Sequence, residues 1–529
     1  MTTATYTVEI DFDRDGTYGH ASSDVTAYVL EMQWQNGMTS SEQEFANPAA
    51  LRLTLSNNAG DFNPEDSGAT FFGLFKKGLL IRIQANLASV DYTLYIGKIR
   101  EIPEIEGAIY SSKQVQVSAS GYMQDLLQAE FAPRFDEAIT TDAALKQVFD
   151  DGILAFPYQS SYWILESSTA SILDQTTILL DGSAAYSFEV GKQTLAYVGD
   201  VSGSENTIRA QQFCRDIVAA EMGGRFWYDT RNGKFLFHHR QRDINPTITV
   251  TLDGDDFEDF IYIDQGTVYN HATVHYYPRS IGTPLSVVWS SPTILSVPAK
   301  DTKTLTARYQ DPDETNVKIA AKDYIMMVRG VDYIANRNAD GSGVDETANV
   351  YVNAEFSAQS AKITLVNNKK RTVHFTTLQV RATPVKTFER QSITLTDTES
   401  ITNYDPQYTT RTLKYVDDEE DVRDFAGTLI GQYGTPITRF ESITFIGNKS
   451  GTRMAQALLR TIGDAVTLQF ADVSHDKNYI IVGERHRIQA GGEHTHECTW
   501  ILKPADNAIY WVLDETGYTE LDETTRLAF

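Results

Sequence analysis

The chain has 529 residues, with 41% hydrophobic residues, 11% aromatic residues, only 15 prolines and a formal net charge of −26. This length exceeds one compact core and predicts about three or four domains. The negative net charge argues against a protein that binds nucleic acid, because that function needs clustered Lys and Arg. Two distant cysteines, Cys214 and Cys498, exclude a disulfide framework. The sequence contains no apolar run of about 18 residues and no signal-peptide pattern, so we expect a soluble protein made in the cytoplasm.

Residues 1–125 show the alternation of apolar and polar residues that is typical of antiparallel strands. Val8, Ile10 and Phe12 alternate with polar residues, and the acidic turn 13–16 follows them. A short aromatic turn of helix is expected near residues 71–75. Further β segments are expected at 24–29, 50–64, 79–84, 92–101 and 114–119.

Residues 126–245 change to a mixed α and β pattern. One helix is predicted to begin near Thr141 and to carry its apolar residues Leu145, Val148 and Phe149 on one face. Three apolar residues at i, i+4 and i+7 mark a second helix, which two glycines end: Phe213, Ile217, Ala220, Gly223 and Gly224. Asn232-Gly233 between two apolar runs is a strong hairpin signal.

The second half of the chain returns to strands and then adds one marked helix. Residues 246–395 contain β patterns separated by polar turns, and residues 356–368 predict two strands that meet in a turn. The acidic run 417–421 precedes apolar residues at helical spacing from Val422 to Tyr433, so it favours the N-terminus of a helix. Strand patterns at 462–468 and 479–488 follow that helix.

Four segments carry short motifs that follow one another in a distinctive order. Segment 1–66 has a strand, then D-x-D-G, D-V-T and L-x-L-x-N-x-x-G-x-F-x-P. Segment 194–240 contains A-E-x-G-G at a helix end and the hairpin pattern G-K-x-x-F-x-x-R. Segment 266–278 is similar to an N-x-V-x-V strand, and segment 401–513 contains I-G-D-x-V, Y-x-I-x-G-x-x-H-x-I and W-x-L. In this order the segments resemble proteins of the tail hub and minor tail class, which lie at the tail tip of bacteriophages.

The resemblance implies a mainly β fold with an α+β insertion, in which two antiparallel β-barrels flank the intervening domains. The expected domains are an N-terminal β-barrel at 1–125, an α+β domain at 126–245, a β-rich domain at 246–395 and a C-terminal barrel-like domain with a tail at 396–529.

The resemblance also implies a structural, non-enzymatic role at the virion tail tip. In that class three copies form a ring that closes or continues the tail tube and leaves a lumen for DNA. The expected partners are further copies of the chain, a tail tube or distal tail protein, a tape measure protein and tip or fibre proteins. No sequence-specific nucleic acid binding, membrane span or cofactor is expected. The acidic balance suits either a wall past which DNA slides or solubility alone.

Two other classes of function stay open from the sequence. A receptor- or glycan-binding module could use exposed aromatic side chains such as Trp34, Trp163 or Trp227, although core packing is the ordinary role of each tryptophan. A polysaccharide-cleaving enzyme would need two carboxylates that face each other across a cleft, and no pair is singled out by its spacing. The sequence also lacks G-x-S-x-G, H-E-x-x-H and Walker motifs.

Two clusters have residue types that bind metals. Asp11, Asp13 and Asp15 match the first half of a calcium loop, but Ser22 occupies the twelfth position, so an acidic turn is favoured.

In the second cluster, His494, His496 and Cys498 project from one face of a predicted strand. His486 would arrive from the neighbouring strand across Gly491-Gly492. The four side chains are either a zinc site or an ordinary hairpin, and no catalytic, cofactor or metal residue is assigned.

Overall fold

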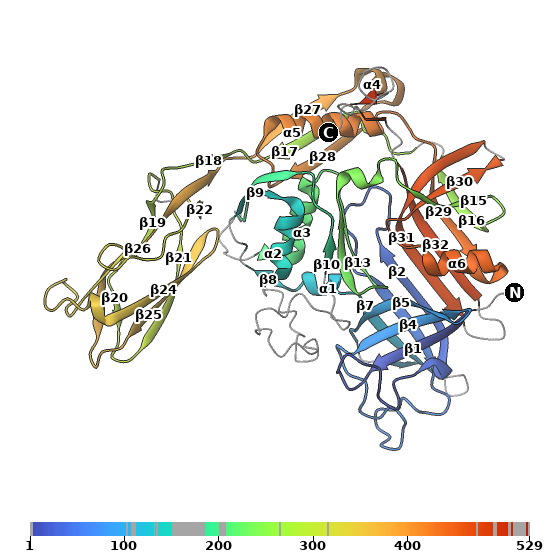
Figure 1. The fold of residues 1–529 in the computed structure, drawn as a ribbon, viewed down its shortest axis with the longest axis horizontal. Helices are drawn as coiled ribbons and strands as arrows, with labels where there is room; N and C mark the ends of the chain where they lie inside the picture. Colours follow the sequence, from blue (N-terminus) through green and yellow to red (C-terminus); the bar gives the residue numbers. More distant parts are fainter. Residues whose placement is uncertain are drawn as a thin grey trace.

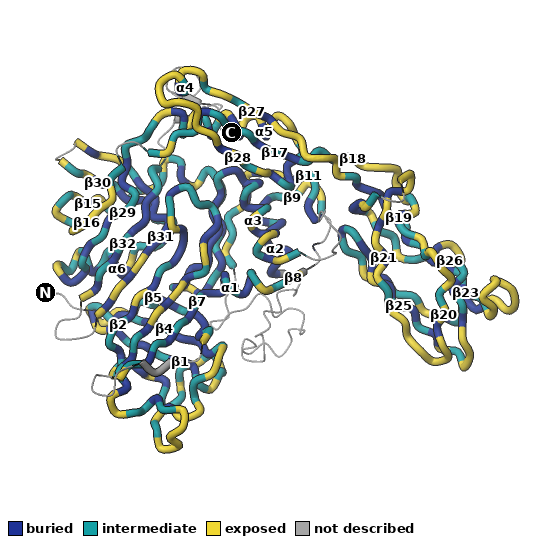
Figure 2. The backbone as a smooth tube through the Cα atoms, turned by 180° about the vertical axis from the view of Figure 1, so that it is seen from behind, coloured by how far each residue is buried: buried dark blue, intermediate teal, exposed yellow. Residues whose placement is uncertain are grey.

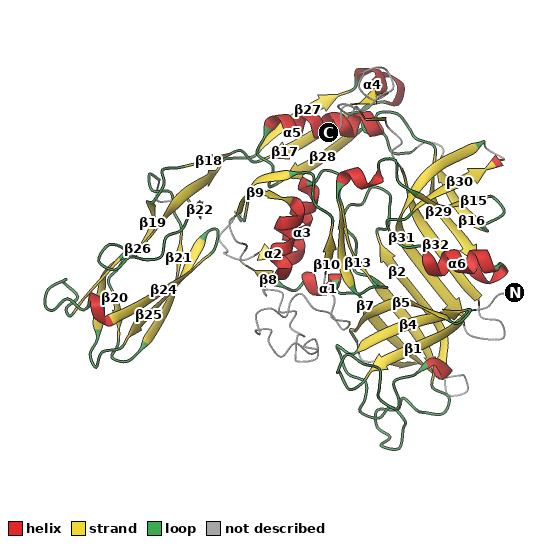
Figure 3. Cartoon of the chain, in the orientation of Figure 1, coloured by secondary structure: helices red, strands yellow, loops and turns green. Residues whose placement is uncertain are grey.

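The structure is a computed structural model that describes residues 4–101, 104–106, 113–131, 133, 136–150, 186–199, 208–263, 266–314, 317–471, 474–489, 495–505, 509–510 and 525–526. Figure 1 shows a broad body from which a narrow β arm extends. Strands dominate both parts; the α-helices lie in the body, and the arm contains the short 3-10 helix Thr347–Asn349 (Figure 3). The fold is therefore mainly β with α+β material inserted, as the sequence predicts. Among the described residues, every helix is too short or too polar to cross a lipid bilayer.

One 13-stranded sheet forms the main part of the body. Its main path, in spatial order, is β1 (Thr5–Asp11), β4 (Leu80–Leu87), β5 (Val90–Ile99), β7 (Gln114–Ser120), β3 (Ala50–Ser56), β2 (Val29–Gly37), β31 (His475–Gln489), β32 (Thr495–Pro504), β29 (Arg439–Ile446) and β16 (Asp259–Ile263). Three strands pair off this path: β6 (Glu104–Glu106), β15 (Ile248–Asp253) and β30 (Ala465–Phe470). The two end segments, expected as two barrels, thus share one sheet.

The pairing of β2 with β31 joins the two ends of the chain. β31 is long, and its first half pairs with β30 while its second half pairs with β2. One apolar core lies under the N-terminal strands and a second lies under the C-terminal strands. Helix α6 (Gly451–Leu459) packs between them, because Met454 and Leu458 belong to the first core and Ala457 belongs to the second.

The α+β unit packs beside this sheet around an apolar core that it shares with α5 (Glu419–Tyr433) and with strands of the large sheet, for example through Phe425 and Val482. It contains α1 (Met123–Leu126), β8 (Glu130–Phe131), β9 (Asp136–Thr140), α2 (Thr141–Asp150), β10 (Tyr186–Phe188), β11 (Thr194–Val198), β12 (Ile208–Arg209), α3 (Ala210–Ala220), β13 (Arg225–Asp229) and β14 (Lys234–His238). Helices α2 and α3 and the β13–β14 hairpin confirm the three elements that the sequence predicts here. Their predicted apolar faces are buried, for example at Leu145 and Phe213.

The arm is inserted in a small sheet that lies on top of the body. This sheet consists of β17 (His271–Tyr276), β27 (Gln391–Thr396) and β28 (Tyr408–Leu413), and α4 (Thr398–Tyr404) and α5 (Glu419–Tyr433) accompany it. Helix α5 begins as predicted, because the side chain of Asp418 accepts hydrogen bonds from the backbone N–H groups of Glu420 and Asp421 at 2.7 and 3.3 Å.

The arm itself is a two-sheet β unit with its own core. The strand β26 (Val373–Thr387) pairs with β18 (Arg279–Ile281), β19 (Ser286–Ser290), β20 (Leu295–Val297), β22 (Ala320–Lys322) and β23 (Tyr333–Asn336). The second sheet contains β21 (Thr302–Arg308), β25 (Ser360–Asn367) and β24 (Val350–Phe356). A short pair, β33 (Ile509–Tyr510) and β34 (Thr525–Arg526), completes the described strands. Figure 2 shows that buried residues run through the body, whereas exposed segments are frequent along the arm.

We expect the body to fold without the arm. The two ends of the arm lie side by side, since the N–H group of Phe388 donates to the carbonyl of Pro278 at 2.9 Å. A variant in which an Asn-Gly turn replaces residues 279–387 should therefore keep the β17–β27 hairpin. The expected result is a soluble body with a cooperative thermal transition and near-unchanged far-ultraviolet circular dichroism per residue. Aggregation of this variant, when the matched full chain is soluble, would contradict an independent body.

Candidate functional site

The tryptophans proposed as glycan platforms are buried where the structure describes them. Trp34 and Trp227 are 3% and 1% exposed, so neither offers a flat aromatic surface to a sugar. Trp34 instead stacks on the ring of His486, with centroids 4.7 Å apart. Trp163 lies outside the described residues. For Trp34 and Trp227, core packing is therefore correct and the binding interpretation is wrong.

The acidic turn after β1 is organised by its own backbone. The carboxylate of Asp11 is buried and accepts hydrogen bonds from the N–H groups of Asp15 and Gly16 at 3.3 and 3.0 Å. Asp15 in turn accepts from the N–H and hydroxyl groups of Thr17 at 2.8 and 2.7 Å. These contacts occupy both carboxylate oxygens of Asp11 and one of Asp15 in a tight turn.

On the solvent side of the large sheet, polar side chains form rows across the β2–β31 junction. Residues that are paired in register share one face of a sheet. One row runs through Ser118, Arg52, Gln33, Arg487 and Glu497. The adjacent row runs through Gln116, Thr54, Glu31, Gln489 and Thr495. We call these two rows the polar face.

The polar face is almost neutral, in contrast to the chain as a whole. It carries two arginines, Arg52 and Arg487, and two glutamates, Glu31 and Glu497, among amide and hydroxyl side chains. Arg487 binds Glu31 at 2.5 Å, and Arg52 donates to the amide oxygen of Gln116 at 2.7 Å. The −26 charge of the chain is therefore carried elsewhere.

Below the junction lies a buried polar chain of five residues. The hydroxyl of Tyr6 lies 2.9 Å from Nδ1 of His496, and Nε2 of His496 lies 2.8 Å from Nδ1 of His486. Nε2 of His486 lies 3.4 Å from the carboxylate of Glu484, which binds Arg231 at 2.8 Å. Tyr6 comes from β1, Arg231 from the β13–β14 turn and the others from β31 and β32. The buried polar chain thus links three separate parts of the sequence.

This arrangement places two of the four predicted metal-ligand candidates together. His486 and His496 are neighbours across the β31–β32 hairpin, as the sequence predicts, and their ring nitrogens face each other, Tyr6 and Glu484. Cys498 is buried opposite His486 in register, and His494 lies outside the described residues. Within the described ranges, no group of three or more His, Cys, Asp or Glu residues is arranged to hold a metal ion.

Burial and the ion pair set the protonation of the buried polar chain. Burial alone would raise the pKa of Glu484, but Arg231 and His486 overcome it and hold the pKa at about 2. Burial lowers the pKa of His486 although Glu484 opposes this, and it lowers the pKa of His496 well below its usual range. Near neutral pH the buried polar chain therefore contains a charged Arg–Glu pair and two neutral imidazoles.

The sequence does not indicate Tyr6 and Arg231, the two outer members of the buried polar chain. Tyr6 follows the ordinary alternation of an amphipathic strand, and Arg231 lies within a hairpin turn, where an exposed position is usual. Long-range packing of β1 and of the β13–β14 turn against β31 and β32 brings them next to the histidines. The sequence thus predicts the proximity of His486 and His496, whereas Tyr6 and Arg231 are identified only by the structure.

Comparisons with known proteins identify structures of the kind that the sequence motifs resemble. No protein-family model matches the chain, and no curated protein matches it. A tail protein from Neisseria meningitidis MC58 matches with a TM-score of 0.44 at 10% identity, covering 94% of this chain and 96% of that chain. The prophage MuSo2 43 kDa tail protein from Shewanella oneidensis matches with a TM-score of 0.43 at 11% identity, covering 94% and 98%. The prophage tail protein gp18 from Listeria monocytogenes EGD-e matches with a TM-score of 0.36 at 8% identity, covering 93% and 94%. At these scores the likeness decides no function, so the functional argument rests on the residues of this chain.

Breaking the buried ion pair should destabilise the body strongly. In an Arg231→Met variant, the fully buried carboxylate of Glu484 loses its counter-charge, which costs about 3–5 kcal/mol. Urea denaturation followed by tryptophan fluorescence measures the change. The double variant with Glu484→Gln should recover part of it. The control is Arg423→Met, which breaks an exposed pair with Glu419 on α5. Equal effects of Arg231→Met and Arg423→Met would contradict a stabilising role for the buried pair.

The two histidines should make the body less stable in acid. Their pKa values are lowered in the folded state, so the unfolded chain takes up protons first as the pH falls through about 6.5. For His496, whose pKa lies well below its usual range, this removes about 1.4 kcal/mol of stability at pH 5.5. A His496→Gln variant should show a smaller loss between pH 7.5 and pH 5.5 in urea denaturation. An identical pH dependence in wild type and variant would exclude this histidine as a cause.

Proposed function

We propose that this chain is a structural hub protein of a bacteriophage tail tip, in which the polar face lines a lumen for DNA. The observation that carries the proposal is the polar face itself, which continues across the junction between the two ends of the chain. The resemblance of four sequence segments to tail hub proteins supports the same assignment. The protein would act by assembly, without catalysis.

A nearly neutral wall of amide and hydroxyl groups fits the passage of DNA. A basic wall would hold the phosphates and release counterions, which produces tight binding. The acidic wall that the sequence suggests would also avoid binding, but it would repel the duplex throughout its passage. In the polar face each charge type is balanced by the other, as in the Arg487–Glu31 pair. We therefore infer that DNA would slide past this surface with little binding.

The same proposal gives the arm a role in contacting neighbouring tail proteins. The arm exposes large apolar side chains at several positions, including Met326, Val328, Val331 and Val344, which are 62%, 45%, 48% and 52% exposed. Apolar surface of this kind is frequent in protein interfaces. We infer that the arm reaches tip or fibre proteins, while the body contacts further copies of the chain, the tail tube or distal tail protein and the tape measure protein.

A ring of three copies is the assembly that we expect, because a heterologous contact whose rotation closes yields a finite channel. Mass photometry should give three times 59.1 kDa, or 177.3 kDa, and image averages should show a central hole. Addition of the tail tube protein is included as a second condition. A monomer in both conditions would contradict the hub.

The orientation of the polar face is tested by site-specific labelling. Both native cysteines are buried, so a single introduced cysteine can be labelled selectively. A Gln33→Cys variant carries a gold label on the polar face, and a Tyr351→Cys variant carries it on the arm, where Tyr351 is 59% exposed. Image averages should place the first label at the central hole and the second at the periphery. A ring with the Gln33 label on its outer surface would keep the ring but overturn the lumen.

A further inference from the structure

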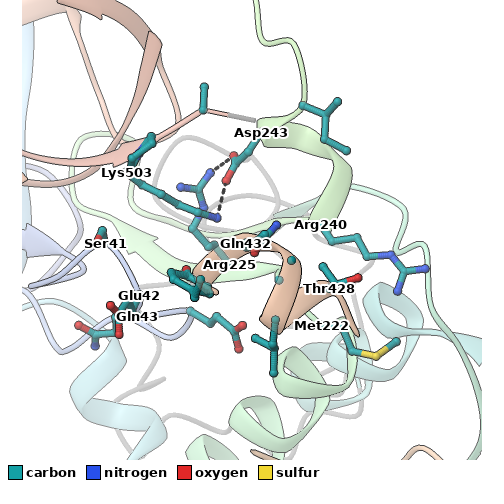
Figure 4. Close-up of a pocket in the computed structure, with 18 of the residues that line it drawn as sticks. Ser41, Glu42, Gln43, Met222, Arg225, Arg240, Asp243, Thr428, Gln432 and Lys503 are labelled. Carbon is teal, nitrogen blue, oxygen red and sulfur yellow. Dashed lines mark hydrogen bonds and ion pairs between the residues drawn. The ribbon is translucent and has the colours of Figure 1, made fainter. Parts of the chain in front are cut away.

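A cavity of about 360 Å³ lies where several separate parts of the chain meet. It is bordered by residues 41–44 after β2, by the segments that follow α3 and β14, by the end of α5 and by the end of β32. Figure 4 shows side chains from these segments around one space, with Glu42, Arg225, Gln432 and Lys503 among them. The cavity is thus separate from the polar face and from the buried polar chain.

The charged side chains that line this cavity are mainly basic, although the chain is acidic overall. Five are cationic: Arg225, Arg240, Arg411, Arg439 and Lys503. Three are acidic: Glu42, Glu44 and Asp243. A local excess of positive charge within a chain of net charge −26 would draw an anion to this place.

Asp243 is occupied by its basic neighbours. Arg225 and Lys503 both bind Asp243, and the Lys503 contact measures 3.0 Å. The side chain of Arg225 is only 3% exposed, and its Nη1 atom has no hydrogen-bond partner among the residues that the structure describes. A buried guanidinium with an unsatisfied donor is costly unless a further acceptor approaches. Arg225 therefore has donor capacity beyond its pair with Asp243.

Among the residues that the structure describes, Arg411 donates only to Thr409 and Thr410 of its own strand, at 3.3 and 3.4 Å. Glu42, in contrast, accepts from the hydroxyl of Tyr269 at 2.9 Å and lies 3.7 Å from Arg439.

We propose that this cavity binds a small oxyanion, such as a carboxylate or sulfate group, through Arg411, Arg225 and Lys503. Arginine forks suit the geometry of oxyanions, and partial burial strengthens each charged hydrogen bond. The lining also includes Phe425, Leu429 and Pro504, which would contact the carbon skeleton of an organic acid. The site goes beyond the proposed hub function, because a ring and a lumen do not require it.

Glu44 opposes the anion and makes its binding depend on pH. Burial raises the pKa of Glu44 to about 7, against the lowering influence of Arg411 and Lys503. The other charged groups of the cavity, on the segments packed around it, are Glu42, Arg225, Arg240, Asp243 and Arg439, and Tyr433 also faces it. Below pH 7 the carboxyl of Glu44 is neutral and its repulsion of the anion disappears, so binding should be tighter at pH 6 than at pH 8.

The first test is isothermal titration calorimetry of the full chain with sodium sulfate, whose charge is constant from pH 6 to pH 8. Sodium chloride at equal ionic strength is the reference. Wild type should bind one sulfate per chain, more tightly at pH 6. Arg411→Gln should weaken binding about tenfold, as expected for a charged hydrogen bond. Glu44→Gln should bind about as tightly at pH 8 as wild type does at pH 6. Arg423→Gln, which is exposed on α5, is the control and should leave binding unchanged.

A second pair of probes separates a free organic acid from an acidic side chain of another protein. Citrate and a tri-glutamate peptide are titrated under the same conditions. Tighter binding of citrate indicates a free anion, and tighter binding of the peptide indicates a protein side chain; either result supports an oxyanion site. Absence of sulfate binding at millimolar concentration, or equal binding by Arg411→Gln and wild type, would overturn the proposal. Both results are independent of ring formation, so they leave the hub function untouched.

Discussion

The register between β2 and β31 is the constraint on which the rest of the body depends. It pairs seven residues near the beginning of the chain with seven near its end, from Glu31 opposite Gln489 to Gly37 opposite Gly483. The two glycines fix the point where the strands approach most closely. A Cβ atom on Gly37 would lie 2.6 Å from the carbonyl oxygen of Val482, and one on Gly483 would lie 2.1 Å from that of Met38. Larger residues would push the strands apart and interrupt the sheet at its centre.

Polar contacts and apolar packing both stabilise the buried side of the β2–β31 junction. Arg231 reaches it from the β13–β14 turn and binds both Glu484 and the backbone carbonyl of Leu458. Since Leu458 lies in α6, this one side chain connects the α+β unit, the long strand β31 and the helix between the two cores. Buried ion pairs contribute little net stability compared with apolar residues, but they demand one geometry. We infer that Arg231 fixes how the α+β unit is oriented against the sheet.

The elements that the sequence predicted well are those whose signals are local. The α5 helix has an acidic N-terminus and an apolar stripe, and the β13–β14 hairpin has Asn232-Gly233 at its turn, so short-range patterns suffice. The neighbourhood of His486 and His496 was also local, because a hairpin connects them. Their partner Tyr6 lies 490 residues from His496, and no periodicity could indicate that contact. The cavity that contains Glu44 and Arg411 depends on the same kind of long-range packing.

The placement of the arm allows one chain to combine a fixed large sheet with an extended surface for contacts with other proteins. It enters and leaves through β17 and β27, which pair with each other, so the arm can vary in length without changing the register of the large sheet. Its core is separate from those of the body, and its contact with the α+β unit includes an ion pair between Lys322 and Glu137. An insertion at a hairpin demands only that its two ends lie close together. The polar face, in contrast, depends on a register across the whole sheet, so we expect the arm to tolerate far more sequence change than β2 or β31.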